Sequence, residues 1–160
     1  MGVVEGWGGS SAASSSASSA VAHRTWEKWA STCVGSSSSG EPLKAALLLN
    51  YDPSAPSRAE QQGTKLKSPD LCPFVDFMRR NDLQKEFFSI GQNQYIVTSI
   101  HEHWFCARCV NTSKPAGEGV IVMQTAAFLL VALYEGSVGA ASRAMAAVDQ
   151  FVSHLNRKNL

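Results

Sequence analysis

The chain has 160 residues, 44% of them apolar, which is enough for one folded domain with a substantial core and too few for two comfortable ones. Its 14 lysines and arginines nearly balance its 13 acids, and the net charge of +1 excludes the bulk positive field that draws proteins onto nucleic acid. Any partner must therefore be recognised by a local surface, and no nucleic-acid partner is expected.

The N-terminal segment is dominated by serine, alanine and glycine, whose small side chains bury too little surface to offset the entropy of ordering. We expect residues 1–24 to be a disordered tail and residues 25–160 to form the folded domain. The start lacks the basic and apolar regions of a secretory signal, and four cysteines lack the density of a disulfide scaffold. The cytoplasm is the expected compartment.

A short helix is expected to begin after Thr25, a suitable N-cap, and to end at Gly35. Apolar residues recur in it every three to four positions, so Trp26 and Trp29 share one face.

Residues 43–51 form an apolar run typical of a strand, and the polar residues 52–67 that follow are expected to be a loop. The sequence Ser-Pro-Asp at residues 68–70 is a good helix start, since it offers a cap, a first-turn proline and a first-turn acid. A helix over residues 68–80 is expected.

Short apolar runs then alternate with polar corners, which is typical of an antiparallel meander. The expected strands cover residues 86–90, 95–100, 104–110, 120–123 and 128–134. The last run is apolar throughout and should lie inside the sheet. Residues 140–157 lack glycine and proline and carry an apolar stripe, which predicts a C-terminal helix.

This order of elements predicts an α+β fold with a central antiparallel β-sheet. We expect the N- and C-terminal helices to pack side by side on one face of the sheet and shorter helices to cover the other.

Four motifs resemble those of the profilin family and occur in the same order along the chain as in that family. Residues 119–125 (Gly-Val-Ile-Val-Met-Gln-Thr) and 128–135 (Phe-Leu-Leu-Val-Ala-Leu-Tyr-Glu) resemble its last two strands. Residues 153–157 (Ser-His-Leu-Asn-Arg) look like the Ser-His-Leu-Arg-Arg ending of animal profilins. Residues 25–29 are similar to the opening Trp-x-x-Tyr, with Trp29 in place of the tyrosine, and residues 91–97 resemble Gly-x-x-x-Tyr-Met-Val. The resemblance is to a divergent member and covers residues 25–160.

The resemblance implies a groove for proline-rich peptides between the terminal helices. Flat aromatic faces can stack on the rings of a pre-extended polyproline II helix, while indole donors meet its carbonyls. The residues implied are Trp26, Trp29, His154, Leu155 and Leu160. Because no aromatic residue follows Tyr51 where the family has another tryptophan, we expect a narrower groove and weaker binding. The alternative for both tryptophans is packing in the core beneath the last helix.

The resemblance also implies binding of monomeric actin and regulation of its polymerisation in the cytoskeleton, through the last strands and the C-terminal helix. The residues implied are Arg108, Gln124, Thr125, Arg143 and Gln150. Phosphoinositide headgroups are a third ligand class of the family, for which clustered cations are required. The small candidate clusters are Arg79, Arg80 and Lys85, and Arg157 with Lys158.

Three other readings stay open. His101 and His103 followed by Cys106 and Cys109 suggest zinc, but residues three apart on one strand point to opposite faces. A roadblock-type scaffold of membrane traffic has a similar architecture and acts by partner contact without actin. Catalysis is not expected, because the sequence holds no phosphate loop or nucleophile elbow, and no cofactor is expected.

Overall fold

The computed structural model describes most of the chain from Ser15 onward. The described residues are 15–35, 41–50, 57–64, 66, 70, 73–74, 78, 87–115, 117–136, 138–158 and 160. No helix within these ranges is long and apolar enough to cross a bilayer.

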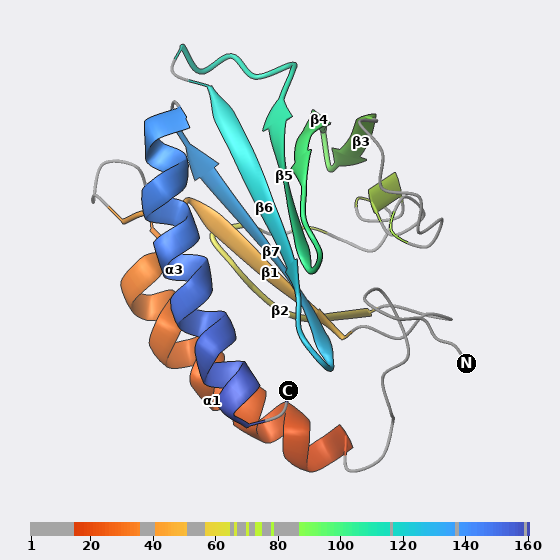
Figure 1. The fold of residues 1–160 in the computed structure, drawn as a ribbon, viewed down its shortest axis with the longest axis vertical. Coiled ribbons are helices and arrows are strands. Elements are labelled where there is room, and N and C mark those ends of the chain that lie inside the picture. The colour runs from red at the N-terminus through yellow and green to blue at the C-terminus, as the bar shows by residue number, and fades with distance from the viewer. Residues whose placement is uncertain are drawn as a thin grey trace.

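One antiparallel sheet of seven strands forms the centre of the molecule (Figure 1), in the order β2-β1-β7-β6-β5-β4-β3. The strands are β1 (Ala45–Asn50), β2 (Ser57–Gln62), β3 (Phe87–Ile90), β4 (Asn93–Ile100), β5 (Trp104–Cys109), β6 (Glu118–Gln124) and β7 (Phe128–Glu135). The five strands from β3 to β7 follow one another in chain order, as expected of a meander. The apolar β7 lies inside the sheet between β1 and β6, as predicted.

The two terminal helices lie side by side on the same face of the sheet (Figure 1). They are α1 (Ser15–Cys33) and α3 (Val138–Arg157). Helix α3 packs on β6 and β7, and α1 packs on α3 and reaches β2. The predicted α+β fold with paired terminal helices is confirmed.

Alternating residues of the inner strands divide the core into two clusters, one on each face of the sheet. In β7, Leu130 and Ala132 face the terminal helices, whereas Leu129 and Val131 face the opposite cluster. Because both faces are covered, β7 is apolar from Phe128 to Leu133. The helical residues Phe74 and Met78 are buried in this opposite cluster, and the other residues of the helix expected over 68–80 lie outside the described residues, apart from 70 and 73.

The stretch 52–67 was expected to be a loop, and this expectation was wrong for residues 57–62. They form the edge strand β2, which pairs with β1 through a shift in register between Leu48 and Leu49. An edge strand needs only one hydrogen-bonding partner and does not need apolar alternation, so its polar sequence gave no strand signal.

Helix α1 begins ten residues before the expected start at Thr25. Its earlier turns bring Ala22, only 2% exposed, into the cluster under the helices, with Val21 packed against it. Alanine favours helix but carries little sequence signal of burial, so tertiary packing decides this boundary. Residues 1–14 of the expected tail lie outside the described residues.

A network of ion pairs and hydrogen bonds surrounds Glu118 at the start of β6. The carboxylate of Glu118, which is 5% exposed, accepts hydrogen bonds from Lys44 and Thr112. Glu135 lies 3.9 Å from Lys44 and 3.4 Å from Lys114. Burial alone would raise the pKa of Glu118, but the hydrogen bonds and the neighbouring lysine charges outweigh it, so the pKa is lowered.

The burial of Ala22 gives a test of where the folded domain begins. Ala22→Asp should lower the free energy of unfolding by at least about 2 kcal/mol, because it buries an unpaired carboxylate. Ala20→Asp makes the same change at an exposed position of the same helix and should have little effect. Urea denaturation of both variants measures this, and equal stabilities would mean that residues up to 24 are not docked.

The network around Glu118 predicts a pH dependence of stability. Because its folded pKa is depressed, the contribution of Glu118 is present above the unfolded value of about 4.3 and is lost as the pH falls through the folded pKa. Glu118→Gln should cost about 1–3 kcal/mol at pH 7 and progressively less towards pH 3.

Thermal unfolding of wild type and Glu118→Gln between pH 7 and pH 3 measures this gap. Glu102→Gln, at an exposed position, is the matched control. A wild-type advantage that does not shrink with acid would contradict the assignment.

Candidate functional site

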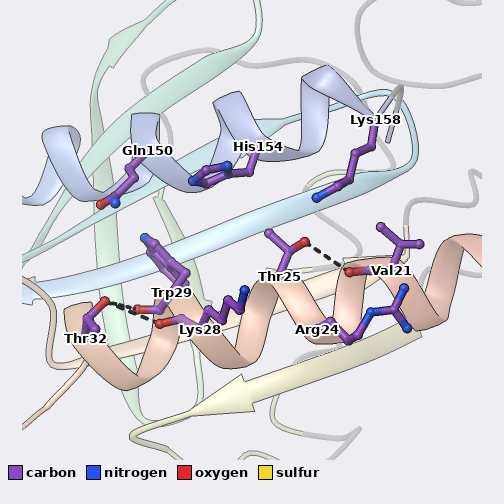
Figure 2. A pocket seen from close by; sticks show the side chains of 9 residues that line it. All are labelled: Val21, Arg24, Thr25, Lys28, Trp29, Thr32, Gln150, His154 and Lys158. Carbon is purple, nitrogen blue, oxygen red and sulfur yellow. Dashed lines mark hydrogen bonds between the residues drawn. The ribbon is translucent and has the colours of Figure 1, made fainter.

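A cleft of about 620 Å³ runs between the outer surfaces of α1 and α3 (Figure 2), and we call it the interhelical cleft. It is lined by Val21, Arg24, Thr25, Lys28, Trp29 and Thr32 from α1, and by Gln150, His154 and Lys158 from α3 and its end. The hydroxyl groups of Thr25 and Thr32 donate to carbonyls of their own helix. The cleft therefore offers mainly basic and amide groups to a ligand.

The cations that line the interhelical cleft lack carboxylate partners among the described residues. Within the described part of the chain, none of Arg24, Lys28 and Lys158 forms an ion pair. Glu27 on α1 and Glu60 on β2 do not line the cleft. Both of these carboxylates pair with His23. The hydrogen bond to Glu60 and the charges of both carboxylates raise the pKa of His23.

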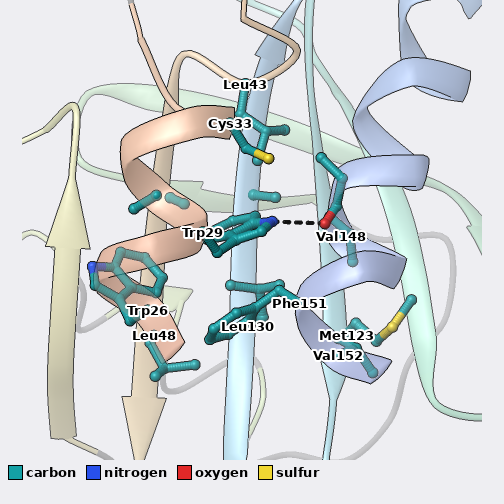
Figure 3. Packing of buried hydrophobic residues seen from close by; sticks show 14 of the residues in the cluster. Trp26, Trp29, Cys33, Leu43, Leu48, Met123, Leu130, Val148, Phe151 and Val152 are labelled. Atoms are coloured by element: carbon teal, nitrogen blue, oxygen red, sulfur yellow. Dashed lines mark hydrogen bonds between the residues drawn. The ribbon is translucent and has the colours of Figure 1, made fainter. Parts of the chain in front are cut away.

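Both tryptophans of α1 belong to the core beneath the helices (Figure 3), where Trp26 is 3% exposed and Trp29 is 4% exposed. The indole Nε1 of Trp29 donates to the carbonyl of Ala147 at 2.8 Å, and its ring stacks on Phe151 with 4.8 Å between centroids. Trp26 meets the same phenyl ring edge-on at 5.7 Å. These contacts join α1 to α3, which is the packing alternative given for the two indoles.

The structure brings together only part of the residue set implied for proline-rich peptides. Leu155 and Leu160 are buried with Trp26 in the core, whereas Trp29 and His154 also line the interhelical cleft. Arg24 and Lys28 were missing from the predicted set. Their spacing of four residues is the signal for a shared helical face, but it can be used only once the helix is known to begin before Thr25.

A second feature is the part of the sheet that α3 does not cover, which we call the uncovered face. It lies on the helix side of strands β3, β4 and β5 (Figure 1) and is formed by Phe87, Ile96 and Arg108. Trp104 and Cys106, which pack against the cluster beneath the helices, form its border with α3. Phe87 is 57% exposed, while the other members are half-buried. Phe87, Ile96 and Arg108 are register partners, so their side chains form one row across three strands.

Arg108 is held in place at the border of this face. Its guanidinium donates to the hydroxyl of Tyr134 at 3.3 Å and to the carbonyl of Gly136 at 2.9 Å. The ring of Tyr134 lies so close over Gly119 that a Cβ there would come within 2.5 Å of it. Gly119, the first residue of the strand motif that resembles profilins, therefore leaves space for the ring of Tyr134, whose hydroxyl binds Arg108.

The remaining residues implied for actin lie apart from Arg108. Gln124 and Thr125 are at the opposite end of β6, beside a pocket of about 560 Å³ that His103, Trp104 and Asp149 also line. The hydroxyl of Thr125 is buried and bonds to Phe128, so it has a structural role. Arg143 and Gln150 are exposed on α3, and Gln150 lines the interhelical cleft.

The candidate zinc residues do not converge in the structure. Cys106 packs against the cluster beneath the helices, and Cys109 packs against the opposite cluster, as strand alternation predicts. No group of three possible metal ligands occurs among the described residues.

Of the cations considered for phosphoinositides, Arg79, Arg80 and Lys85 lie outside the described residues. Arg157 is exposed and contacts the Nδ1 atom of His154 at 3.1 Å, and Lys158 lines the interhelical cleft. These two cations therefore adjoin the same cleft.

Comparisons with known proteins agree with this architecture. A sequence model of the profilin family matches residues 24–160. The crystal structure of profilin II from Acanthamoeba castellanii superposes with a TM-score of 0.58 at 14% sequence identity, and the match covers 84% of this chain and 99% of that one. No curated protein sequence matches the chain. The match to the family model over nearly the whole described domain shows that the chain belongs to the profilin family.

Proposed function

We propose that the chain binds monomeric actin and thereby regulates actin polymerisation. In this proposal it works in the cytoplasm, at the cytoskeleton, as a binding protein without catalysis. The observation that carries the proposal is the uncovered face, since the exposed Phe87 and the neighbouring Ile96 give it an apolar surface that suits a large protein partner.

The uncovered face has the composition of an interface centre with a polar border. Phe87 and Ile96 supply apolar surface, and Arg108 supplies a cation held in place by Tyr134. A pre-positioned arginine loses little side-chain entropy when it meets a carboxylate on a partner. Gln124 is proposed for the far border, where its Oε1 atom is buried without a hydrogen-bond partner among the described residues.

Arg143 and Gln150 remain proposed as peripheral actin contacts on α3. Thr125 is proposed to act indirectly, because its hydroxyl fixes the turn between β6 and β7 through Phe128.

Proline-rich peptides are the second proposed ligand, and the interhelical cleft is their proposed site. Trp29 and His154 would contact the peptide, while Trp26, Leu155 and Leu160 would support the floor from below. The indole donor of Trp29 is already used by Ala147, so one donor for a proline carbonyl is lost. We expect a neutral polyproline peptide to bind weakly, with a Kd of about 0.1–1 mM. Phosphoinositide binding through Arg157 and Lys158 is a lesser proposal.

A polymerisation assay with pyrene-labelled actin tests the main proposal. Wild type at micromolar concentration should lengthen the lag and slow spontaneous assembly. Ile96→Asp should weaken this effect about tenfold or more, because a carboxylate beside Phe87 would have to be desolvated on binding.

Gln62→Asp, at an exposed position on β2 at the other edge of the sheet, is the matched control and should behave like wild type. Circular dichroism establishes that each variant is folded. If folded wild type leaves both lag and plateau unchanged, the proposal fails and a scaffold role without actin becomes the better reading.

A further inference from the structure

We infer that the interhelical cleft selects a peptide segment with acidic side chains. This inference deepens the proposed peptide site and rests on the proposed function only for the location of that site. It concerns the chemistry of the ligand, which the family resemblance leaves as neutral polyproline.

Basic side chains line the cleft in two rows that face each other (Figure 2). The cations Arg24 and Lys28 lie one helical turn apart on α1, and the cation Lys158 lies one turn beyond His154 at the end of α3. Among the described residues that line the cleft, none is aspartate or glutamate. An extended chain between the helices can therefore meet cations on both sides.

Several other basic residues of the molecule have carboxylate partners, whereas these cations have none among the described residues. Lys44 and Lys114 both have glutamate partners, and His23 has two. Arg24, Lys28 and Lys158 have no ion-pair partner within the described part of the chain, although acids and bases are nearly equal in number. Grouping unpaired like charges in a concave site raises the local potential, and an anionic ligand relieves their repulsion.

The floor of the cleft is poorly suited to a neutral polyproline helix. Trp29 exposes only 4% of its surface and has its N–H bonded to Ala147, so little aromatic area remains for proline rings. The Oε1 atom of Gln150 accepts a hydrogen bond from the thiol of Cys33 at 3.9 Å, so the amide nitrogen of Gln150 can donate to a peptide carbonyl. Charge and backbone recognition thus replace aromatic stacking.

A concave site also favours a peptide over a membrane surface. The cations flank a channel between two helices, where a narrow chain can enter and reach both rows. A flat bilayer would contact the ridges of the two helices before the groups inside. We therefore assign the cleft to a peptide segment of a partner protein with closely spaced carboxylates.

The test uses the full chain and two peptides of about ten residues, one alternating glutamate with proline and the other alternating glutamine with proline. Calorimetric titration at low salt should show the glutamate peptide binding about tenfold more tightly, since two or three partly exposed ion pairs supply about 1–2 kcal/mol. The preference should shrink when the salt concentration is raised.

The double variant Arg24→Gln with Lys28→Gln should remove about tenfold of the affinity for the glutamate peptide and leave the glutamine peptide unaffected. Two residues of α1 are changed at exposed positions, so folding should be retained. Lys114→Gln removes an exposed cation that does not line the cleft and should bind like wild type.

Equal affinity for the two peptides would overturn the inference and favour a neutral polyproline site. Binding of neither peptide, with normal slowing of actin assembly, would overturn the cleft as a peptide site while the actin proposal stands. Binding to vesicles containing phosphorylated inositol lipids, with no response to the glutamate peptide, would reassign the cleft to a lipid headgroup.

Discussion

The contact between Trp29 and α3 is the constraint on which the arrangement of this molecule depends. Its indole stacks on Phe151 and donates to the carbonyl of Ala147, so one side chain fixes both the distance and the register of the two terminal helices. A buried aromatic ring contributes a large apolar area, and its N–H must find a partner when water is excluded. Phe151 packs against the ring and Ala147 accepts from the N–H, and both residues lie near the C-terminal end of the chain.

This close packing determines which surfaces remain available. Because α1 and α3 lie side by side over the β1, β7 and β6 part of the sheet, the helix side of β3, β4 and β5 is left as the uncovered face. The same packing draws the aromatic rings inward, so the interhelical cleft is bordered by the long basic side chains that remain outside. Two surfaces of different chemistry thus follow from one helix pairing, and each can serve a different partner.

The sequence predicted those parts of the fold whose signal is local. Strands β6 and β7 and helix α3 have strong apolar patterns, and their bounds agree with the structure within two residues. Strand β2 was missed because a polar edge strand is defined by its pairing with β1. The early start of α1 was missed because a serine- and alanine-rich segment gains its helical structure from the docking of residues such as Ala22.

The candidate sites were less predictable than the fold, for a physical reason. A stripe of aromatic residues at helical spacing looks the same whether it faces a ligand or a core, so Trp26 and Trp29 could not be assigned from spacing alone. The grouping of Arg24 and Lys28 with Lys158 depends on the pairing of two helices that are far apart in the chain. Similarly, the separation of Gln124 from Arg108 follows from the length of β6, because Gln124 ends that strand and Arg108 on β5 pairs with Gly119 near its start.

The 118-residue separation between Trp29 and Ala147 also affects how the protein is made. At a synthesis rate of about 5–20 residues per second, Trp29 is translated about 6–24 seconds before Ala147. Strands β1 to β7 are translated in this interval, yet the cluster beneath the helices cannot close without Phe151 and Leu155. The nascent chain therefore holds two indoles that lack their core partners until translation is almost finished.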